Sequence, residues 1–348
     1  MNLYILNESF DAVGIVDNAA SIIWNSRYYE SGDFEIYITA NSETVNLYQK
    51  DYYIYRVDDE TICIIENIKL TSDNETGDYL TVSGHCAKSL LARRIVWQQT
   101  TINRTAENAI RKLITDAIIT PTIESRKIEN FTLSPVLGLT ERLERQFTGT
   151  NLYEAVVEIC KTFNYGWKVT FNLQSKQFIF SIYQGSDRSS NQSVNPRVKF
   201  SPEFDNLLGS SYTLDSSSYK NVALIAGEGE GKSRKTQMVG EASGLNRYEL
   251  FIDARDISSN EGEITETEYN KLLQEKGINQ LAETVISESF SGEVDTTRTY
   301  QYKKDYFLGD IVTIENEYGM AADTRIVEVI ESLDENGYRS IPTFENWE

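Results

Sequence analysis

The hydrophobic period changes twice along the chain, and this change limits the fold more than any other feature. Residues 1–100 are mostly segments in which β-branched and aromatic residues alternate or cluster between turn signals, which is typical of strands. Residues 101–195 carry apolar residues at spacings of three and four, which is typical of helices. Residues 196–348 return to the strand pattern. The sequence therefore predicts a mainly β protein with an α+β insertion.

The N-terminal segment is expected to form a small antiparallel barrel or sandwich. Its predicted strands are Ile36–Thr39, Tyr52–Val57, Ile62–Ile68 and Leu80–Ser83. The turn at residues 73–78 superficially resembles a calcium loop. With Gly77 at the sixth position, the first, third and fifth ligands become Ser72, Asn74 and Thr76, so the acidic spacing fails. We expect a hairpin loop there.

The middle segment is expected to be a compact α+β unit. One helix runs along the stripe Ala106 to Ile118 and ends before Pro121. A second begins after Asn151, which with Glu154 forms a capping arrangement, and stops at Gly166. Strands at 167–171 and 178–183 then pair with each other, and a polar linker at 185–196 follows. These patterns give the domains 1–100, 101–195 and 196–348, the last with a helical insertion near 265–288 that Gly277 breaks or kinks.

Residues 221–258 contain the stretch that most resembles a nucleotide-binding loop. If residues 231–233 ended a Walker A motif, glycine would be needed at position 226, where the chain has Ala226. Glu228 and Glu230 inside the loop would also repel phosphate oxygens. The sequence therefore argues against phosphate binding here.

The same stretch is interpreted as a long hairpin. Its first strand is Val222–Ile225 and its second is Tyr248–Ile252. The turn between them is expected to need positive φ angles at Gly227, Gly229 and Gly231.

The side chains of common catalytic and metal sites are scarce. His85 is the only histidine, at the end of a predicted strand, and we interpret it as half-buried and structural. Cys63, Cys86 and Cys160 are odd in number and lie in apolar-patterned segments, so they are expected to be buried reduced thiols, although a Cys63–Cys86 bridge between neighbouring strands is an open alternative. They lack any CxxC spacing, which argues against a zinc site. We predict no catalytic, cofactor-binding or metal-binding residue and no cofactor.

Charge and hydropathy exclude further classes of protein. The formal charge of −20 repels duplex DNA and anionic membranes, and no export signal or membrane span is indicated. Acidic residues gather at 253–295, with eleven against three basic ones, and at 315–348, with nine against two. These runs form either a solvated face or the lining of a channel through which an anionic polymer slides.

Tyrosine is frequent, with 21 copies. Tyr28, Tyr29, Tyr52, Tyr53 and Tyr55 lie close together in the sequence. Aromatic residues with polar tips are enriched at interfaces, so we expect subunit contacts, with carbohydrate stacking as the alternative.

Several short motifs, in order, resemble the hub proteins of bacteriophages with long flexible tails. They include W..RYYE.G.FE from Trp24 to Glu35, LTVSG from Leu80 followed by LLARR from Leu90, GSDRS from Gly185, FSPEFDN from Phe200, NVALIAGEGEG from Asn221, GLNRYELFIDAR from Gly244 and DYFLGDIVTI from Asp305. Many members of that family continue into a cell-wall hydrolase, whereas this chain stops at Glu348.

The resemblance implies two β-barrel-like domains of related fold that flank the insertion. It also implies a non-enzymatic homotrimeric baseplate hub in the virion tail, made in the bacterial cytoplasm. Its partners would be the distal tail protein, tape-measure or tube proteins and receptor-binding components, and DNA would pass through without specific binding. Three duplicated barrels would join a six-fold tube to a three-fold tip. The turn at Leu308–Asp310 would close the second barrel.

Two other functions stay open. A glycan-cleaving enzyme needs only two carboxylates about 5 to 10 Å apart across an aromatic groove, and the 53 acidic residues allow such a pair. A carbohydrate-binding module would instead expose a tyrosine or tryptophan platform.

Overall fold

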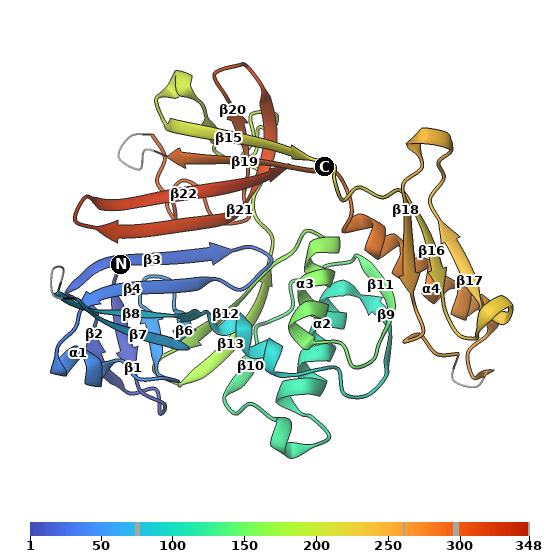
Figure 1. The fold of residues 1–348 in the computed structure, drawn as a ribbon, viewed down its shortest axis with the longest axis horizontal. Coiled ribbons are helices and arrows are strands. Elements are labelled where there is room, and N and C mark those ends of the chain that lie inside the picture. Colours follow the sequence, from blue (N-terminus) through green and yellow to red (C-terminus); the bar gives the residue numbers. More distant parts are fainter. Residues whose placement is uncertain (74–76, 260–261, 295–298, 347–348) are drawn as a thin grey trace.

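The computed structural model describes residues 1–73, 77–259, 262–294 and 299–346. In this part of the chain the strands form four sheets, and the helices cover parts of three of them (Figure 1). The prediction of a mainly β protein is confirmed. No helix among the described residues is long and apolar enough to cross a membrane.

The largest sheet has ten strands and joins the two ends of the chain. Its two halves meet where β21 pairs with β3 in antiparallel register, from Glu328 opposite Arg27 to Leu333 opposite Ile22. In each half, two strands that follow one another in the chain form a hairpin beside this contact. The first strand of each hairpin, β3 or β21, is the one that pairs with the other half. In order across the sheet the strands are β15 Leu207–Asp215, β19 Ser287–Val294, β22 Gly337–Asn346, β21 Ala321–Asp334, β3 Ala19–Arg27, β4 Asp33–Thr39, β8 Gly77–His85 and β7 Asn67–Asp73, with β20 Ile311–Glu315 on β21 and β14 Lys199–Phe200 on β20.

The seven-stranded sheet combines N-terminal strands with strands of the predicted insertion. Strand β12 joins β6 through Thr170 opposite Thr61. The order is β10 Phe131–Leu133, β13 Gln177–Tyr183, β12 Gly166–Asn172, β6 Thr61–Ile64, β5 Tyr53–Arg56, β1 Leu3–Leu6 and β2 Ala12–Ile15. Both large sheets therefore contain strands from more than one of the predicted domains. The domain boundaries at residues 100 and 195 remain a prediction.

Each part of the molecule has its own hydrophobic core. The N-terminal core lies between β1, β5 and β6 on one side and β3, β4 and β8 on the other, with Trp24 and Phe34 inside it. At Gly84 a side chain would overlap the Ile64 carbonyl, so glycine allows the two sheets to approach closely. A second core lies under helices α2 Ala106–Ile114 and α3 Leu152–Thr162, a third within the C-terminal strands, and a fourth beneath α4 Glu266–Ala282.

The two predicted helices of the insertion are confirmed. Helix α2 Ala106–Ile114 continues into a wider π-type turn at Thr115–Ile119, and Thr105 caps its start by accepting from the Asn108 amide. Helix α3 Leu152–Thr162 is capped by Asn151, whose side chain accepts from the amides of residues 153 and 154. The paired strands that follow are β12 and β13. The short helix α1 Ser42–Leu47 is not predicted, since its pattern is too brief.

Gly277 does not break the C-terminal helix. Helix α4 Glu266–Ala282 runs through it without interruption, after a capping box formed by Thr265 and Glu268. A side chain at Gly277 would press on Ile225 and Val239 of the neighbouring sheet. The glycine therefore lets the helix pack closely on that sheet, and the expectation of a kink was wrong.

The long hairpin of the sequence interpretation is also wrong. Strand β16 Val222–Ala226 turns directly into β17 Thr236–Val239, which runs antiparallel to it. The predicted second strand, β18 Glu249–Asp253, pairs with the other side of β16 and runs parallel to it. Backbone hydrogen bonds from Gly227 to Lys235 and from Lys235 to Glu228 close the loop early, so the chain returns sooner than predicted.

The glycines of this loop have different roles. Gly229 and Gly231 have positive φ angles of 96° and 51°, as predicted. Gly227 does not have a positive φ. Glycine is needed there for a different reason, because a side chain would overlap the Tyr269 hydroxyl. Among the hairpin loops, residues 74–76 of the rejected calcium loop lie outside the described residues, while the flanking strands β7 and β8 pair as predicted.

The tyrosine cluster belongs to the core and not to an exposed interface. Tyr28, Tyr29 and Tyr55 are buried, and Tyr52 and Tyr53 are half-buried. The rings of Tyr28, Tyr29, Tyr53 and Tyr55 pack between the N-terminal strands and β12 and β13, while Tyr52 packs against the N-terminal core. Tyr28 and Tyr29 contact each other edge to face. The hydroxyls of Tyr28 and Tyr29 both bond to Asn164 of the same chain, and subunit contacts through tyrosine stay a prediction.

The cysteines and the histidine depart from the expectation in part. Cys160 is a buried free thiol, as predicted. Cys63 and Cys86 form a disulfide between β6 and the end of β8, so these two are not reduced thiols. His85 lies at the end of β8 as expected, but its side chain is exposed, with Nδ1 2.6 Å from a carboxylate oxygen of Glu66.

Candidate functional site

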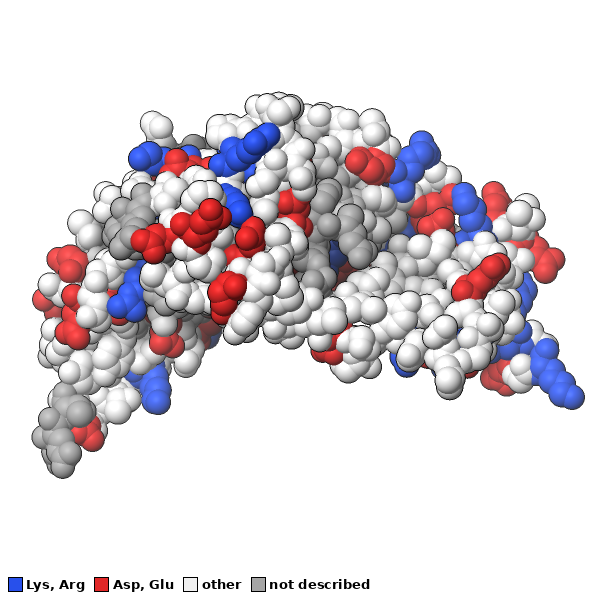
Figure 2. All heavy atoms as spheres, turned by 90° about the horizontal axis from the view of Figure 1, so that it is seen from above, with Lys and Arg blue, Asp and Glu red and all other residues white. Residues whose placement is uncertain are grey.

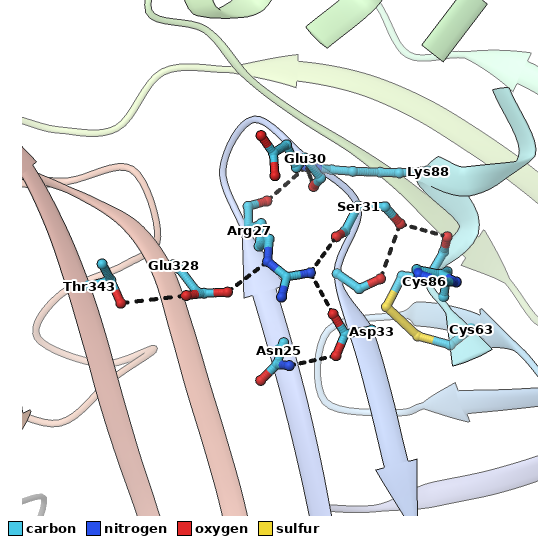
Figure 3. A network of polar contacts seen from close by, with 12 residues as sticks. Asn25, Arg27, Glu30, Ser31, Asp33, Cys63, Cys86, Lys88, Glu328 and Thr343 are labelled. Carbon is cyan, nitrogen blue, oxygen red and sulfur yellow. Dashed lines mark hydrogen bonds and ion pairs between the residues drawn. A yellow bond between two sulfur atoms is a disulfide. The ribbon is translucent and has the colours of Figure 1, made fainter. Parts of the chain in front are cut away.

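The loop that follows β3 joins three parts of the molecule. Arg27 donates from Nε to Glu328 of β21 at 2.6 Å and from Nη1 to Asp33 and to the Ser31 carbonyl (Figure 3). Lys161 of α3 forms an ion pair with Glu30 at 2.8 Å. One short loop therefore contacts the C-terminal sheet and the helical insertion.

Lys88 holds the same loop from its inner side. Its ammonium group donates to the backbone carbonyls of Arg27, Tyr28 and Glu30 at 2.8 to 3.1 Å. It also lies 4.7 Å from the ring centre of Trp167, whose indole nitrogen donates to the Tyr29 carbonyl. Burial lowers the pKa of Lys88 to about 7. The three carbonyl groups that accept from this ammonium group offset the cost of its burial.

Lys88→Met is expected to lower the free energy of unfolding by about 2 kcal/mol or more, because each buried acceptor without a donor costs about 1 to 3 kcal/mol. Between pH 7 and 10.5 the unfolded chain holds more protons at this lysine than the folded chain, so Lys88 makes stability rise with pH in that range. Urea unfolding at several pH values measures both effects. Lys168→Met, at an exposed lysine near the same place, is the control, and an equal loss there would contradict the role of Lys88.

The side chain of Tyr28 lies at the centre of this region. It is fully buried, and side chains built at Gly166 or Gly309 would overlap its ring. Its hydroxyl donates to the Asn164 carbonyl at 3.1 Å and accepts from the Gly185 amide at 3.4 Å. Three of the motifs that carry the family resemblance, at residues 27–30, 185–189 and 308–310, therefore meet around one ring.

Asp310 completes the contact between the linker and the C-terminal part. It accepts from the Ser186 amide at 2.8 Å, from Arg188 Nε at 2.7 Å and from the Phe307 amide at 3.0 Å. Arg325 donates to the Gly309 carbonyl at 2.6 Å. Asp310 thus accepts from two backbone amides, and Gly309 beside it has a positive φ, so the turn has a structural role; closure of a second barrel by this turn stays a prediction. The residues 27–33, 164–167, 185–188 and 307–310 are called the junction below.

A second ionic cluster lies beside the junction. Arg56 of β5 binds Glu331 of β21 through two hydrogen bonds of 2.7 Å, and the two side chains are 3% and 1% exposed. Lys303 lies 2.6 Å from Asp59 and 3.3 Å from Glu331. Burial by itself raises the pKa of Glu331, but Arg56 and Lys303 outweigh it and hold that pKa below its ordinary value. The cluster fixes the N-terminal strands to the C-terminal sheet.

A cavity of about 620 Å³ opens between the junction and this cluster. Its wall includes three carboxylates, and each lies near a cation: Asp58 at 3.7 Å from Arg56, Asp59 at 2.6 Å from Lys303 and Asp310 at 2.7 Å from Arg188. Burial raises the pKa of Asp59, but Lys303 and Arg56 bring it below its usual value. A glycosidase needs one carboxylic acid with a raised pKa, whereas the pKa of Asp59 is lowered, so Asp59 is poorly suited to that role.

In the described residues, the polar groups of the glycine-rich loop and the exposed tryptophan Trp97 are engaged in contacts within the chain. Glu228 of the glycine-rich loop accepts from the Ser259 amide and hydroxyl, both at 2.7 Å, so its carboxylate closes the loop. No group of three or more His, Cys, Asp or Glu side chains in the described ranges could hold a metal ion. Trp97 is exposed, but the Arg126 guanidinium lies over its ring at 5.2 Å. The junction instead brings residues of separate sequence motifs together through hydrogen bonds and ion pairs.

Comparison with known proteins identifies the family. Residues 2–344 match the family model of siphovirus ReqiPepy6 Gp37-like proteins. The chain belongs to this family. The predicted resemblance to tail proteins of phages with long flexible tails is thereby confirmed. A comparison with curated protein sequences finds no match.

Solved structures of other proteins are similar in fold to this chain over nearly its whole length. The 43 kDa tail protein of prophage MuSo2 from Shewanella oneidensis has a TM-score of 0.58 and 12% identity, covering 99% of this chain and 98% of that one. The tail protein from Neisseria meningitidis MC58 has the same TM-score and identity, with coverage of 99% and 96%. Prophage tail protein gp18 from Listeria monocytogenes EGD-e has a TM-score of 0.55 and 11% identity, with coverage of 100% and 95%. The whole chain has the fold of prophage tail proteins.

Proposed function

We propose that this protein is a non-enzymatic structural component of a siphophage tail tip, where three copies form a ring that joins the tail tube to the host-recognition parts. The observation that carries the proposal is the match of the family and of the tail-protein fold over nearly the whole chain. The distal tail protein, tape-measure or tube proteins and receptor-binding components are its proposed neighbours. The protein is made in the bacterial cytoplasm and resides in the virion.

The junction supports a mechanical role. A hub transmits force between its neighbours, so its own parts must not shift against one another. Here the insertion, the N-terminal strands and the C-terminal sheet meet around Tyr28, Lys88 and the Arg56–Glu331 pair, all of them buried. Buried polar networks with satisfied partners hold one arrangement of the chain in preference to others. We infer that the junction keeps the parts of the protein rigid and does not carry out a reaction.

The two opposed hairpins of the ten-stranded sheet support the proposed duplication. Because the first strands β3 and β21 meet in antiparallel register, the two halves are related by an approximate two-fold axis in their strand order. Three such chains would present six similar units, which is the number that a six-fold tube requires.

Passage of DNA through the ring is part of the proposal, and some carboxylates of the two acidic runs are already paired with cations of the same chain. Glu328 and Glu331 are bound to arginines, Asp253 to Arg234 and Arg255, and Asp256 to Lys276. On the face in Figure 2, acidic and basic side chains are interspersed. We therefore propose a wall with weak net negative charge, which lets DNA pass because it offers no cluster of cations to the phosphates.

The native mass of the protein, alone and mixed with its tail neighbours, tests this proposal. We expect a species of three chains, each of 39.7 kDa, at high concentration or with the neighbours present. A chain that stays monomeric in every mixture would contradict the hub. Release of reducing sugar from bacterial cell walls by the purified protein would instead support the glycan-cleaving alternative.

A further inference from the structure

Three arginine side chains, Arg93, Arg94 and Arg126, lie in the wall of a hollow of about 390 Å³ on the helical insertion. The insertion is at the lower centre of Figure 1, where α2 and β9 Thr100–Thr105 are labelled. Arg93 and Arg94 end the LLARR motif, whose function the junction does not explain. This arginine hollow gathers positive charge on a chain whose formal charge is −20.

Backbone carbonyl groups hold two of these guanidinium groups in place. Arg94 donates from Nε to the Arg126 carbonyl at 2.7 Å and from Nη1 to the Arg93 carbonyl at 2.9 Å. Arg126 donates from Nη2 to the Ile95 carbonyl at 2.6 Å. Most of the N–H donors of both groups therefore stay available to another acceptor.

No carboxylate of the described residues forms an ion pair with any of the three arginines. The acidic side chains around the hollow pair with lysines instead. Asp116 lies 2.5 Å from Lys112, and Glu124 and Glu129 lie 3.6 and 3.2 Å from Lys127. The charge of the arginine hollow is therefore not neutralised within the described part of the chain.

An anion placed in the arginine hollow would relieve the repulsion among its cations. Burial and the charges of Arg126 and Arg93 lower the pKa of Arg94. The planar fork of a guanidinium group matches the oxygens of a phosphate or a carboxylate. At physiological salt, charges more than about 8 Å away are largely screened, so the three arginines outweigh the net charge of the chain for an anion bound between them.

A second hollow, of about 260 Å³, adjoins the first, because Trp97 and Arg126 are in the walls of both. Its wall also carries the exposed side chains of Gln98, Thr120 and Thr122. Amide and hydroxyl groups both donate and accept hydrogen bonds, which suits the hydroxyls of a sugar or polyol. Trp97 is 56% exposed although Arg126 lies over its ring at 5.2 Å, so part of an apolar surface stays open beside these groups. This second hollow is called the hydroxyl hollow.

We propose that the two hollows together bind a phosphate joined to a sugar or polyol unit, with the phosphate in the arginine hollow and the hydroxyls in the hydroxyl hollow. Such units occur as free sugar phosphates and as the repeats of anionic polymers on bacterial surfaces. Bound polymer would give a tail-tip protein a direct contact with the host surface. The inference goes beyond the proposed hub, since it requires neither the trimer nor the ring.

The hydroxyl hollow favours this ligand over two other anions. Deoxyribose inside a DNA strand has no free hydroxyl group, and an acidic peptide offers carboxylates without a unit that carries several hydroxyls. Both anions suit the arginine hollow, but they leave the hydroxyl hollow without a matching group.

Binding of fluorescently labelled poly(glycerol phosphate), followed by polarisation at fixed salt, tests the proposal. Arg93→Gln is expected to weaken binding about tenfold or more, because it removes a charge-assisted contact. Arg93 is exposed, so the change spares the fold. Arg104→Gln is the matched control, since Arg104 is exposed on β9 and lines neither hollow, and its Kd should stay near that of the wild type. Equal losses in both variants, or a wild type that does not bind the polymer, would overturn the proposal.

Tryptophan emission shows where the polymer binds. Trp97 is exposed, whereas Trp24 and Trp167 are buried. The polymer is expected to change the emission of the wild type and not that of Trp97→Phe. The same change in both proteins would place the polymer elsewhere and contradict the assignment.

Competition by unlabelled compounds separates the classes of ligand. Glycerol 3-phosphate is expected to displace the polymer at a lower concentration than inorganic phosphate, and Thr122→Val should reduce this preference. Equal displacement by the two compounds would overturn the role of the hydroxyl hollow. Stronger displacement by hexaglutamate or by single-stranded oligothymidine than by unlabelled polymer of equal charge would assign the site to an acidic protein or to DNA, against the proposal.

The same competition identifies the source of the phosphate. Unlabelled polymer that acts at a much lower phosphate concentration than glycerol 3-phosphate supports a surface polymer as the ligand. Equal action of polymer and monomer, each stronger than inorganic phosphate, supports a small sugar or polyol phosphate.

Discussion

Replacing Gly309 with valine is expected to prevent stable folding. The residue has a φ of +94°, where a β-branched side chain is strained, and a Cβ there would overlap the buried ring of Tyr28. Strain at such a position costs about 1 to 3 kcal/mol, and forcing extra atoms into a packed core costs a similar amount. The sum is a large part of the 5 to 15 kcal/mol that typically stabilises a domain. The soluble fraction after expression and the thermal unfolding midpoint measure the effect.

Gly319→Val separates the two causes. Gly319 has a φ of +75° in the turn between β20 and β21, but nothing lies within 4 Å of the position that its Cβ would take. It therefore carries the cost of the backbone conformation alone, and we expect a soluble, moderately destabilised protein. If Gly309→Val unfolded at the same temperature as the wild type, the account of the junction would be wrong.

Glu331→Gln is expected to lower the free energy of unfolding by about 3 to 5 kcal/mol, because it leaves the buried Arg56 guanidinium without its charged partner. The change keeps the size of the side chain, so lost packing does not explain the result. Asp51→Asn is the control, since Asp51 forms an exposed ion pair with Lys50 and should cost less than about 1 kcal/mol. Guanidinium-induced unfolding of the three proteins measures the difference, and equal values for both variants would contradict the role of the pair.

Acid should remove the same stabilisation. The pKa of Glu331 is lower in the folded chain than in the unfolded chain, because Arg56 and Lys303 outweigh the effect of burial. The stabilising contribution is therefore complete above the unfolded pKa, about 4.3, and is lost as pH falls through the folded value. The wild type should lose stability in acid more steeply than Glu331→Gln. If Glu331→Gln does not fold, the double change Arg56→Met with Glu331→Leu should, since an apolar pair removes both buried charges.

Local patterns in the sequence predict local structure well. The helices at 106–114 and 152–162 follow from apolar spacing and from caps at Thr105 and Asn151, all within a few residues of the helix itself. The turn at Gly309 is equally local, because positive φ favours glycine. Motifs such as RYYE and GSDRS were sufficient for the family, although their physical meaning was not evident from the letters.

The arrangement of the sheets and the junction could not be predicted in this way. Alternation shows which face of a strand is buried, but it does not show what covers that face. The pairing of β3 with β21 joins residues about 300 positions apart, and the partner of Arg56 is Glu331. The same limit explains two wrong predictions, in which backbone geometry was taken as the reason for Gly277 and Gly227. Glycine is instead needed at Gly277 because the sheet beneath α4 lies close to it, and at Gly227 because Tyr269 does.

A cryo-electron microscopy reconstruction of the virion tail tip tests the central claim most directly. The account predicts a three-fold ring in which each copy fits as one rigid body, between the end of the tube and the host-recognition parts, with an open or openable passage on the axis. A reconstruction that contains this chain only as a monomer, or that lacks it from the tip altogether, would contradict the account.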